Sequence, residues 1–214
     1  MALRQLALPT RPFQIRKHDL AIALQKVKPH PKPDVALEQY TIPADLAAEI
    51  LFTACYTHGD IEEKRVLDLG TGTGRLALGA SILGAATIVG VDIDASSIHV
   101  ASRSAKVLDV EADWVVGDIA VIRGPFDTVL MNPPFGTKQP HADIKFLQSA
   151  ESLASVIYSI HKSSTRSFLG HWLENQGLKG ERIMSRKMEI PHQFSFHRKP
   201  KRFVEVDVFR IFRA

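Results

Sequence analysis

Short runs of consecutive apolar residues alternate along the chain with longer segments in which apolar residues recur every three or four positions. The runs predict buried strands at 65–70, 86–92, 112–118, 126–132 and 155–161. The longer segments predict helices at 75–83, 95–107, 143–154 and 164–176. Two further strands, near 178–190 and 203–212, leave no room for a helix between them, so we expect them to pair antiparallel. The pattern predicts an α/β fold with one doubly wound, mostly parallel seven-stranded sheet and an antiparallel last strand.

The N-terminal part of the chain differs from this alternating region. Residues 16–27 have apolar positions at helical spacing, and the segment KPHPKPD at 28–34 then breaks the pattern with three prolines. Pro43 is placed in the first turn of a second helix that reaches about Cys55. We therefore expect a basic N-terminal extension, residues 1–33, with a short helix and a proline-rich linker. One main domain, residues 34–214, follows it.

A glycine-rich loop joins the first predicted strand to the first helix of the alternating region, in the sequence VLDLGTGTG. Gly70, Gly72 and Gly74 allow a tight turn and a close approach of a ligand to the backbone. A carboxylate lies near the end of each of the first three strands. These residues are Asp68, Asp92 and Asp118. Any one of them can instead be a helix N-cap or a turn former.

The spacing of these carboxylates indicates the kind of ligand. Asp92 ends the second strand, where a carboxylate can accept hydrogen bonds from both ribose hydroxyls of an adenosine, and Asp118 can accept one from the exocyclic amine of a base. The loop has no lysine and no Walker sequence, so a phosphate-bearing cofactor fits poorly. A cofactor with ribose, adenine and a free ammonium fits better, and S-adenosylmethionine has these groups.

The fourth strand ends in the tetrapeptide Asn132, Pro133, Pro134 and Phe135. Prolines have no N–H, so their carbonyls are free of adjacent donors. The side-chain oxygen of Asn132 and the carbonyl of Pro133 can together accept both hydrogens of a planar NH₂ group, and Phe135 can stack on the ring that carries this group. Such a site acts by positioning and electrostatics. The alternative is a rigid turn that ends the strand.

Charge is unevenly distributed along the chain. The net charge is +4, and Lys and Arg are concentrated in residues 1–40 and 179–202, around an acidic centre. Basic ends favour a polyanionic partner such as RNA, although a solvated surface has the same composition. Candidate RNA contacts are Lys162, Arg166, Phe196, His197, Arg198 and Lys199. In the segment IHKSSTR, the alternative is that Ser163 or Ser164 is only a helix N-cap.

Composition restricts the other possibilities. An apolar content of 45% and a charged content of 23% are typical of a globular domain. The single cysteine, Cys55, excludes a disulfide within the chain, and the nine histidines show no metal-ligand spacing, so we expect no metal site. The chain has no signal-peptide pattern and no apolar run of membrane-spanning length. We expect a cytoplasmic protein without a membrane partner.

These motifs, together with LEQY, VDID, YSIHKSSTR and FSFHRK, resemble the methyltransferase-like protein five family over nearly the whole chain. The resemblance implies a Rossmann-like class I S-adenosylmethionine-dependent methyltransferase that modifies N6 of an adenine in small-subunit ribosomal RNA. It implies cofactor contacts from Gln39, Gly70, Thr73, Asp92, Asp118 and Ile119, and adenine contacts from residues 132–135. It also raises the possibility of a small zinc-binding activator protein as a partner. The family tends to have a threonine where Ile42 stands, which puts one cofactor contact in doubt.

Other functions stay open at this point. A glutamine amide in a protein is also a planar NH₂ group, and adenine in DNA is a third acceptor. No segment of the chain is evident that would read a sequence in duplex DNA. The fold could also serve a non-catalytic RNA-binding assembly factor, although the intact Asn132 and Phe135 argue against that.

Overall fold

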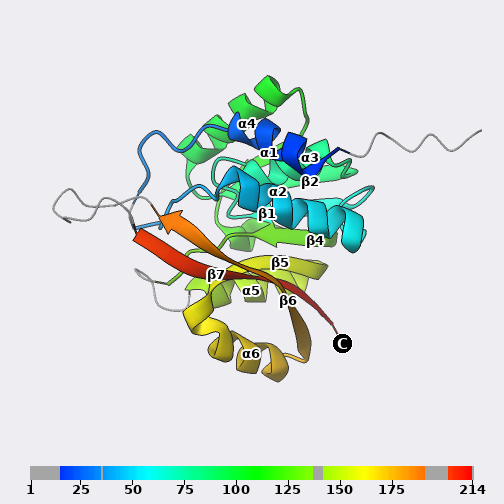
Figure 1. Ribbon diagram of the computed structural model, residues 1–214, viewed down its shortest axis with the longest axis vertical. Helices are drawn as coiled ribbons and strands as arrows, with labels where there is room; N and C mark the ends of the chain where they lie inside the picture. Colours follow the sequence, from blue (N-terminus) through cyan, green and yellow to red (C-terminus); the bar gives the residue numbers. More distant parts are fainter. Residues whose placement is uncertain (1–14, 35, 137–141, 191–201, 214) are drawn as a thin grey trace, which may run out of the picture.

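The structure of the protein is a computed structural model that describes residues 15–34, 36–136, 142–190 and 202–213. One seven-stranded sheet forms its centre (Figure 1). The strands are β1 (Arg65–Leu69), β2 (Thr87–Asp92), β3 (Asp113–Val116), β4 (Phe126–Met131), β5 (Ala154–Lys162), β6 (Leu178–Ile190) and β7 (Arg202–Arg213). Their spatial order is β3-β2-β1-β4-β5-β7-β6. Strands β1 to β5 pair in parallel, and β7 is antiparallel to both β5 and β6, so the predicted fold is confirmed.

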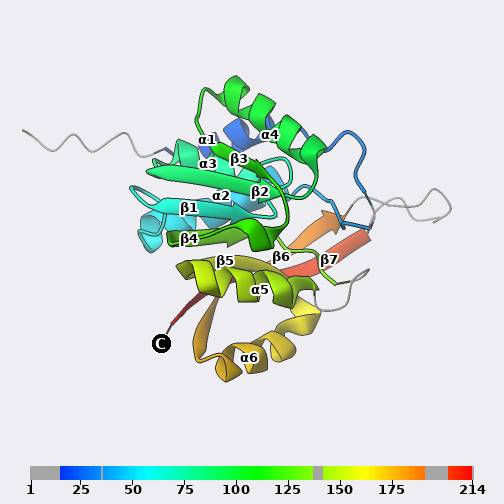
Figure 2. The same ribbon diagram turned by 180° about the vertical axis from the view of Figure 1, so that it is seen from behind.

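Helices lie on both faces of the sheet (Figures 1 and 2). They are α1 (Lys17–Gln25), α2 (Ala44–Phe52), α3 (Arg75–Ile82), α4 (Ala95–Leu108), α5 (Ala142–Leu153) and α6 (Arg166–Asn175). A π-helical turn, Thr53–Thr57, continues α2, and 3₁₀ turns occur at Ile119–Val121 and Ser163–Thr165. Pro43 is the N-cap of α2 and not part of its first turn, because its extended ψ of 143° precedes the helical residues. None of the helices in the described residues is long and apolar enough to cross a bilayer.

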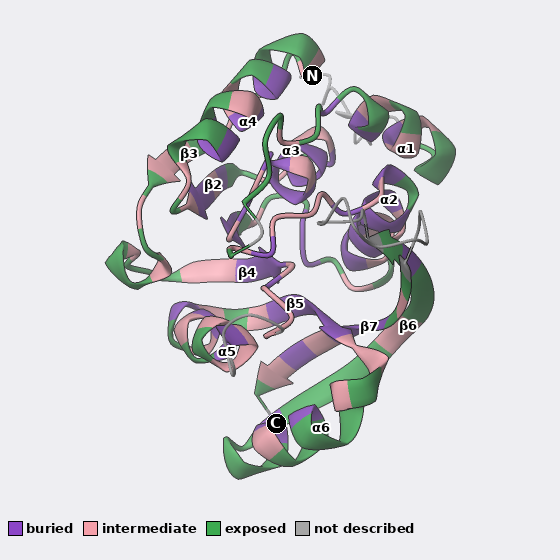
Figure 3. Ribbon diagram, turned by 90° about the vertical axis from the view of Figure 1, so that its left-hand side faces the viewer, coloured by how far each residue is buried: buried purple, intermediate pink, exposed green. Residues whose placement is uncertain are grey.

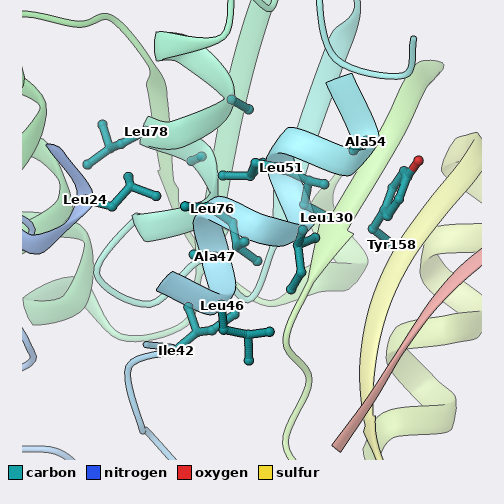
Figure 4. Packing of buried hydrophobic residues seen from close by; sticks show 14 of the residues in the cluster. Leu24, Ile42, Leu46, Ala47, Leu51, Ala54, Leu76, Leu78, Leu130 and Tyr158 are labelled. Atoms are coloured by element: carbon teal, nitrogen blue, oxygen red, sulfur yellow. The ribbon is translucent and has the colours of Figure 1, made fainter. Parts of the chain in front are cut away.

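Alternate residues of each strand enter two different hydrophobic cores. In β4, Leu130 points to the core formed with α1, α2 and α3, whereas Val129 and Met131 point to the core formed with α5 and α6. Figure 4 shows the first core, in which side chains of α2 and α3 surround Leu130. Strand β6 forms the edge of the sheet opposite β3, and most residues of β6 and of helix α6 are exposed there (Figure 3).

The first helix is part of this main core. Leu20 and Leu24 of α1 are 0% exposed and belong to the same cluster as α2 and α3. Gly79 of α3 allows the close approach, since a Cβ atom there would lie 2.3 Å from Leu51 and 3.3 Å from Leu24. The division of the chain at residue 33 stays a prediction from composition; the helix before it packs against the domain after it.

The register of the parallel strands brings their carboxyl ends to one edge. Leu69 pairs with both Val91 and Met131, and Asp92 pairs with Val116. The residues that follow these strands therefore lie along one side of the sheet. This is the edge at which open α/β sheets bind ligands.

Candidate functional site

The glycine loop between β1 and α3 is held against the end of β2. The backbone N–H groups of Gly70 and Thr71 both donate to the carbonyl of Val91, at 3.0 and 2.9 Å. The N–H of Gly72 donates to the carboxylate of Asp92 at 2.8 Å. Hydrogen bonds therefore join the loop to Asp92, the predicted ribose acceptor.

The glycines of this loop have different roles. All three have positive φ, at 72° for Gly70, 55° for Gly72 and 84° for Gly74. A Cβ atom at Gly74 would lie 2.7 Å from Trp114, so this glycine lets α3 pack closely, and it does not line the cavity described below. A Cβ atom at Gly72 would meet nothing within 4 Å. The open side of the loop is therefore at Gly72, where a ligand can approach the backbone.

Asp68 organises the loop from beneath. Its side chain is 1% exposed and accepts hydrogen bonds from the hydroxyl of Thr71 at 2.7 Å and the N–H of Ala77 at 2.9 Å. Burial raises the pKa of Asp68 to about 7, although these two hydrogen bonds act to lower it; the nearby charge of Asp92 also raises it. Asp68 thus fixes the loop to α3 at the floor of the site.

Asp92 and Asp118, at the strand ends, both accept hydrogen bonds from backbone N–H groups nearby. Asp92 accepts from the N–H of Asp94 at 2.9 Å as well as from Gly72, and burial raises its pKa although these bonds stabilise the ionised form. Asp118 is the N-cap of the 3₁₀ turn at 119–121 and accepts from the N–H of Ala120 at 2.8 Å. Both carboxylates nevertheless line the cavity, so the N-cap and ligand-binding interpretations of these residues are compatible.

Residues 28–34 and 36–42, here called the strap, lie over the cofactor side of the site. Arg75, the first residue of α3, holds the chain at Val27, just before the strap, and at Ile42, its last residue, because its guanidinium donates to both carbonyls. Asp94 binds its middle, where the side-chain nitrogen of Gln39 donates to Asp94 at 2.8 Å and the Nε2 atom of His30 lies 2.9 Å from the same oxygen. The strap is therefore anchored by Arg75 and Asp94, which lie beside the carboxyl edge of the sheet.

The hydrogen-bond partners of Asp94 determine the charge of its carboxyl group. Burial acts to raise the pKa of Asp94, but hydrogen bonds from Gln39, Ser96 and Ser97 outweigh burial and hold the pKa well below its ordinary value. The Nδ1 atom of His30 accepts from the N–H of Lys32 at 3.1 Å, and its Nε2 atom faces Asp94. An ionised Asp94 thus holds the ring of His30 and the amide of Gln39.

One cavity joins these features, with a volume of about 630 Å³. Its lining brings together most of the predicted site, namely Gln39, Asp68, Gly70, Gly72, Thr73, Asp92, Asp118, Ile119, Asn132 and Pro134. The described residues contain no cluster of three or more His, Cys, Asp or Glu side chains suited to a metal ion.

Four buried side-chain atoms of residues that line this cavity have no hydrogen-bond partner among the described residues. They are the oxygens of Tyr40, Thr73 and Asn132 and the Nε atom of Arg75. A buried acceptor without a partner is costly, and such groups mark places where a ligand supplies the missing bond. Asn132 follows directly on β4, so its free oxygen lies at the carboxyl edge beside the glycine loop.

The aromatic ring of the tetrapeptide is packed by two neighbours. The Phe135 ring lies with its centroid 5.1 Å from that of Tyr40, and the Nζ atom of Lys162 lies 5.5 Å from the Phe135 centroid. The hydroxyl of Tyr40 is buried, also without a partner among the described residues. Burial, and secondly the charge of Glu38, raises the pKa of Tyr40 well above 10, so the hydroxyl stays protonated.

The predicted RNA contacts fall into three groups. Lys162 lies at the site, over Phe135. Arg166 forms a bidentate pair with Asp207, at 2.7 and 3.0 Å, and its side chain is half exposed, so its RNA contact stays a prediction. Ser163 also donates to Asp207, at 3.0 Å, so it is not the predicted N-cap; Thr165 precedes α6. Phe196, His197, Arg198 and Lys199 lie outside the described residues.

Several residues of the site were not predicted from the sequence. Phe146 of α5 covers Gly70, where a Cβ atom would approach its ring to 2.7 Å. Glu38 and Tyr40 reach the tetrapeptide, and His30 reaches Asp94. Only the position of Tyr40 and Glu38 beside the predicted Gln39 hinted at a role; the other contacts depend on packing between distant segments.

Comparison with known proteins identifies the family. A family model described as the methyltransferase small domain matches residues 42–154. METTL5 of Danio rerio, an rRNA N(6)-adenosine-methyltransferase, is 37% identical over 90% of this chain and 96% of its own length. The chain belongs to the METTL5-like methyltransferase family. Another member, Mettl5 of Drosophila melanogaster, is 36% identical over 87% of this chain and 92% of its own length.

A solved structure extends the similarity to the METTL5-like fold. A proposed RNA methyltransferase from Pyrococcus horikoshii superposes with a TM-score of 0.86 at 40% identity, covering 94% of this chain and 98% of that chain. The expected class I fold and methyltransferase activity are thereby confirmed, and so is S-adenosylmethionine as the cofactor. The open glycine loop, the carboxylate of Asp92 and the unpartnered Thr73 hydroxyl fit this cofactor's ribose and charged groups.

Proposed function

We propose that this METTL5-like protein transfers a methyl group from S-adenosylmethionine to N6 of an adenine in small-subunit ribosomal RNA. The observation that carries the proposal is the buried side-chain oxygen of Asn132, an acceptor without a partner among the described residues, at the edge of the cofactor cavity. The rRNA N(6)-adenosine activity of relatives that align with nearly the whole chain supports adenine as the acceptor.

The chemistry follows from what the tetrapeptide offers. The cofactor supplies an electrophilic methyl group. Asn132 and the carbonyl of Pro133 accept the two hydrogens of the planar amine, which favours a pyramidal nitrogen whose lone pair can attack. The residues thus contribute orientation and electrostatic stabilisation, and no strong base is needed because the methylated ammonium product loses its proton readily. Gln39, Asp68, Gly70, Thr73, Asp92, Asp118 and Ile119 are the proposed cofactor contacts.

The RNA must bring an unstacked adenine to this edge. A base within a helix cannot present its amine to Asn132, so the target is an unpaired or extruded adenine. The Nζ atom of Lys162 lies 5.5 Å from the centroid of the Phe135 ring, which supports Lys162 as a proposed RNA contact. We extend the RNA surface to Phe196, His197, Arg198 and Lys199 on the basis of their composition. A small zinc-binding activator and a cytoplasmic location stay predictions from the family resemblance and the composition.

The experiment is methyl transfer from isotopically labelled S-adenosylmethionine to purified small and large ribosomal subunits, their deproteinised RNAs, and total protein. Mass spectrometry of digested nucleosides then identifies the product. We expect N6-methyladenosine in RNA of the small subunit. Label in the large-subunit RNA would correct the target, and label on a protein glutamine would replace the adenine assignment. Absence of transfer to any acceptor, with the cofactor bound, would favour a non-catalytic RNA-binding factor.

A further inference from the structure

Glu38 connects the strap to the tetrapeptide. Its Oε2 atom accepts a hydrogen bond from the backbone N–H of Phe135 at 2.8 Å, across 97 residues of sequence. The residue is 8% exposed. Burial of a carboxylate is unfavourable unless hydrogen bonds compensate for the lost water, so this contact is a specific arrangement and not a chance surface pair.

The backbone at Glu38 is also unusual. Its φ is 52°, in the left-handed region that residues with a Cβ atom rarely adopt. Such conformations persist where the surroundings impose them, and they cluster at functional sites. Here the surroundings hold consecutive residues at two places, because Glu38 binds Phe135 and Gln39 binds Asp94. A single segment of the strap therefore contacts both the acceptor side and the cofactor side of the site.

The backbone of the tetrapeptide depends on a hydrogen bond from another segment of the chain. Strand β4 ends at Met131, so the sheet no longer holds the chain beyond it. Pro133 and Pro134 have no N–H, and the N–H of Phe135 is the first backbone donor after Asn132. The carboxylate of Glu38 takes this donor and thereby fixes the backbone that carries the aromatic ring.

We propose that Glu38 is a positioning residue for methyl transfer, which holds Phe135 in place relative to the side-chain oxygen of Asn132. The inference rests on the proposed function in one respect, since it assumes that Phe135 stacks on the ring of the acceptor. Tyr40 supports the same ring from the strap. The role does not require that Glu38 touch the acceptor or move a proton.

Two variants test this role. Glu38→Ala removes the acceptor of the Phe135 N–H, and we expect the single-turnover rate at saturating acceptor to fall about 10- to 100-fold, the loss that corresponds to a hydrogen bond with a charged group. The affinity for S-adenosylmethionine, measured by calorimetry, should stay within about threefold. Glu38→Gln keeps an acceptor oxygen and should recover most of the rate.

Glu63→Ala is the matched control. Glu63 is an exposed glutamate with a φ of 58° that does not line the cavity, so it tests the same substitution at the same backbone conformation. We expect wild-type rates from it. A Glu38→Ala protein that also keeps the wild-type rate overturns the positioning role, and so does a Glu38→Gln protein as slow as Glu38→Ala.

The test is independent of the identity of the acceptor. The ratio of variant to wild-type rate is measured on whichever acceptor the wild type methylates, RNA or protein, so a wrong substrate leaves it valid. Amide hydrogen exchange of Phe135, followed by NMR without any acceptor, supplies a second measurement. We expect protection that Glu38→Ala removes and Glu38→Gln largely keeps; an unprotected Phe135 amide in the wild type overturns the proposal.

Discussion

The side-chain nitrogen of Gln39 lies 2.8 Å from the carboxylate of Asp94, which it holds from 55 residues away in the sequence. The same Gln39 accepts from the N–H of Asp34 at 2.7 Å, so its amide is fixed at both ends. Asp94 follows the predicted ribose acceptor Asp92 by two residues and donates its N–H to it. The strap is thereby tied to Asp92, a proposed cofactor contact.

Gln39→Ala should weaken binding of S-adenosylmethionine by roughly 5- to 150-fold, because it removes two hydrogen bonds that hold the strap, each contributing about 0.5–1.5 kcal/mol. Isothermal calorimetry measures the effect. Gln25→Ala, which changes an exposed glutamine of α1 outside the cavity lining, is the control and should bind normally. Unchanged affinity in Gln39→Ala would mean that the strap contributes nothing to the cofactor site.

Asn132→Ala should preserve the fold and the affinity for the cofactor but lower the rate of methyl transfer by roughly two orders of magnitude or more, because it removes the preorganised acceptor of the amine. The rate is measured in single turnovers with saturating RNA. The control is Asn175→Ala, at the exposed end of α6. Normal turnover in Asn132→Ala would reduce the tetrapeptide to a strand-ending turn.

Asp68 should make stability depend on pH. Burial raises its pKa to about 7 from an ordinary value of 3.8, so the folded state favours the protonated form. The free energy of unfolding therefore falls as pH rises through this interval. Asp68→Asn stays neutral and avoids the penalty, which reaches on the order of 4 kcal/mol above pH 7, at 1.36 kcal/mol per pKa unit.

Urea denaturation of the wild type and Asp68→Asn between about pH 4 and pH 8 measures this difference. We expect the free energy of unfolding of the variant to increase relative to that of the wild type as pH rises. The amide oxygen of the variant can still accept from Thr71 and Ala77. The control is Asp113→Asn, which changes an exposed aspartate of β3. Its free energy of unfolding should depend on pH as that of the wild type does. A constant gap between wild type and Asp68→Asn across this range would show that Asp68 is ionised throughout.

Neutralising Arg198, Lys199, Lys201 and Arg202 together should weaken RNA binding and flatten its dependence on salt, because fewer counterions are released on binding. Cofactor affinity should not change. Filter binding over a series of salt concentrations gives the slope. Neutralising Arg103 and Lys106, exposed on α4, is the control for loss of positive charge elsewhere. An unaltered slope in the fourfold variant would mean that this basic segment is only solvated surface.

Much of the fold could be predicted because its signals are local. Buried parallel strands need continuous apolar runs, and the helices between them need apolar residues on one face, so the order of elements is present in the chain. Because parallel strands end at one edge, the glycine loop, Asp92, Asp118 and Asn132 could be assigned to one site before any contact was known. The cavity lining contains all of them, with Gly70 and Gly72 from the loop.

Other roles depended on contacts that no local pattern encodes. Arg166 was predicted from the sequence as an RNA contact only, and the structure adds its ion pair with the fully buried Asp207. Gly74 belongs to the glycine loop by sequence and to helix packing by structure, since Trp114 occupies the space beside it. The type of a residue limits the interactions that it can make, and the residues packed around it in the folded structure determine which of them forms.

The sequence by itself determined the class of fold, the sheet edge that carries the candidate site and the tetrapeptide that follows β4, because each follows from the order of residues along strands and turns. Only the tertiary structure decided what closes the site. Arg75 binds the carbonyls of Val27 and Ile42, and Glu38 binds Phe135, between segments far apart in the chain. The physical reason is that backbone carbonyls and amides carry no mark in the sequence, so their partners are fixed only when the core brings the strap and the sheet edge together.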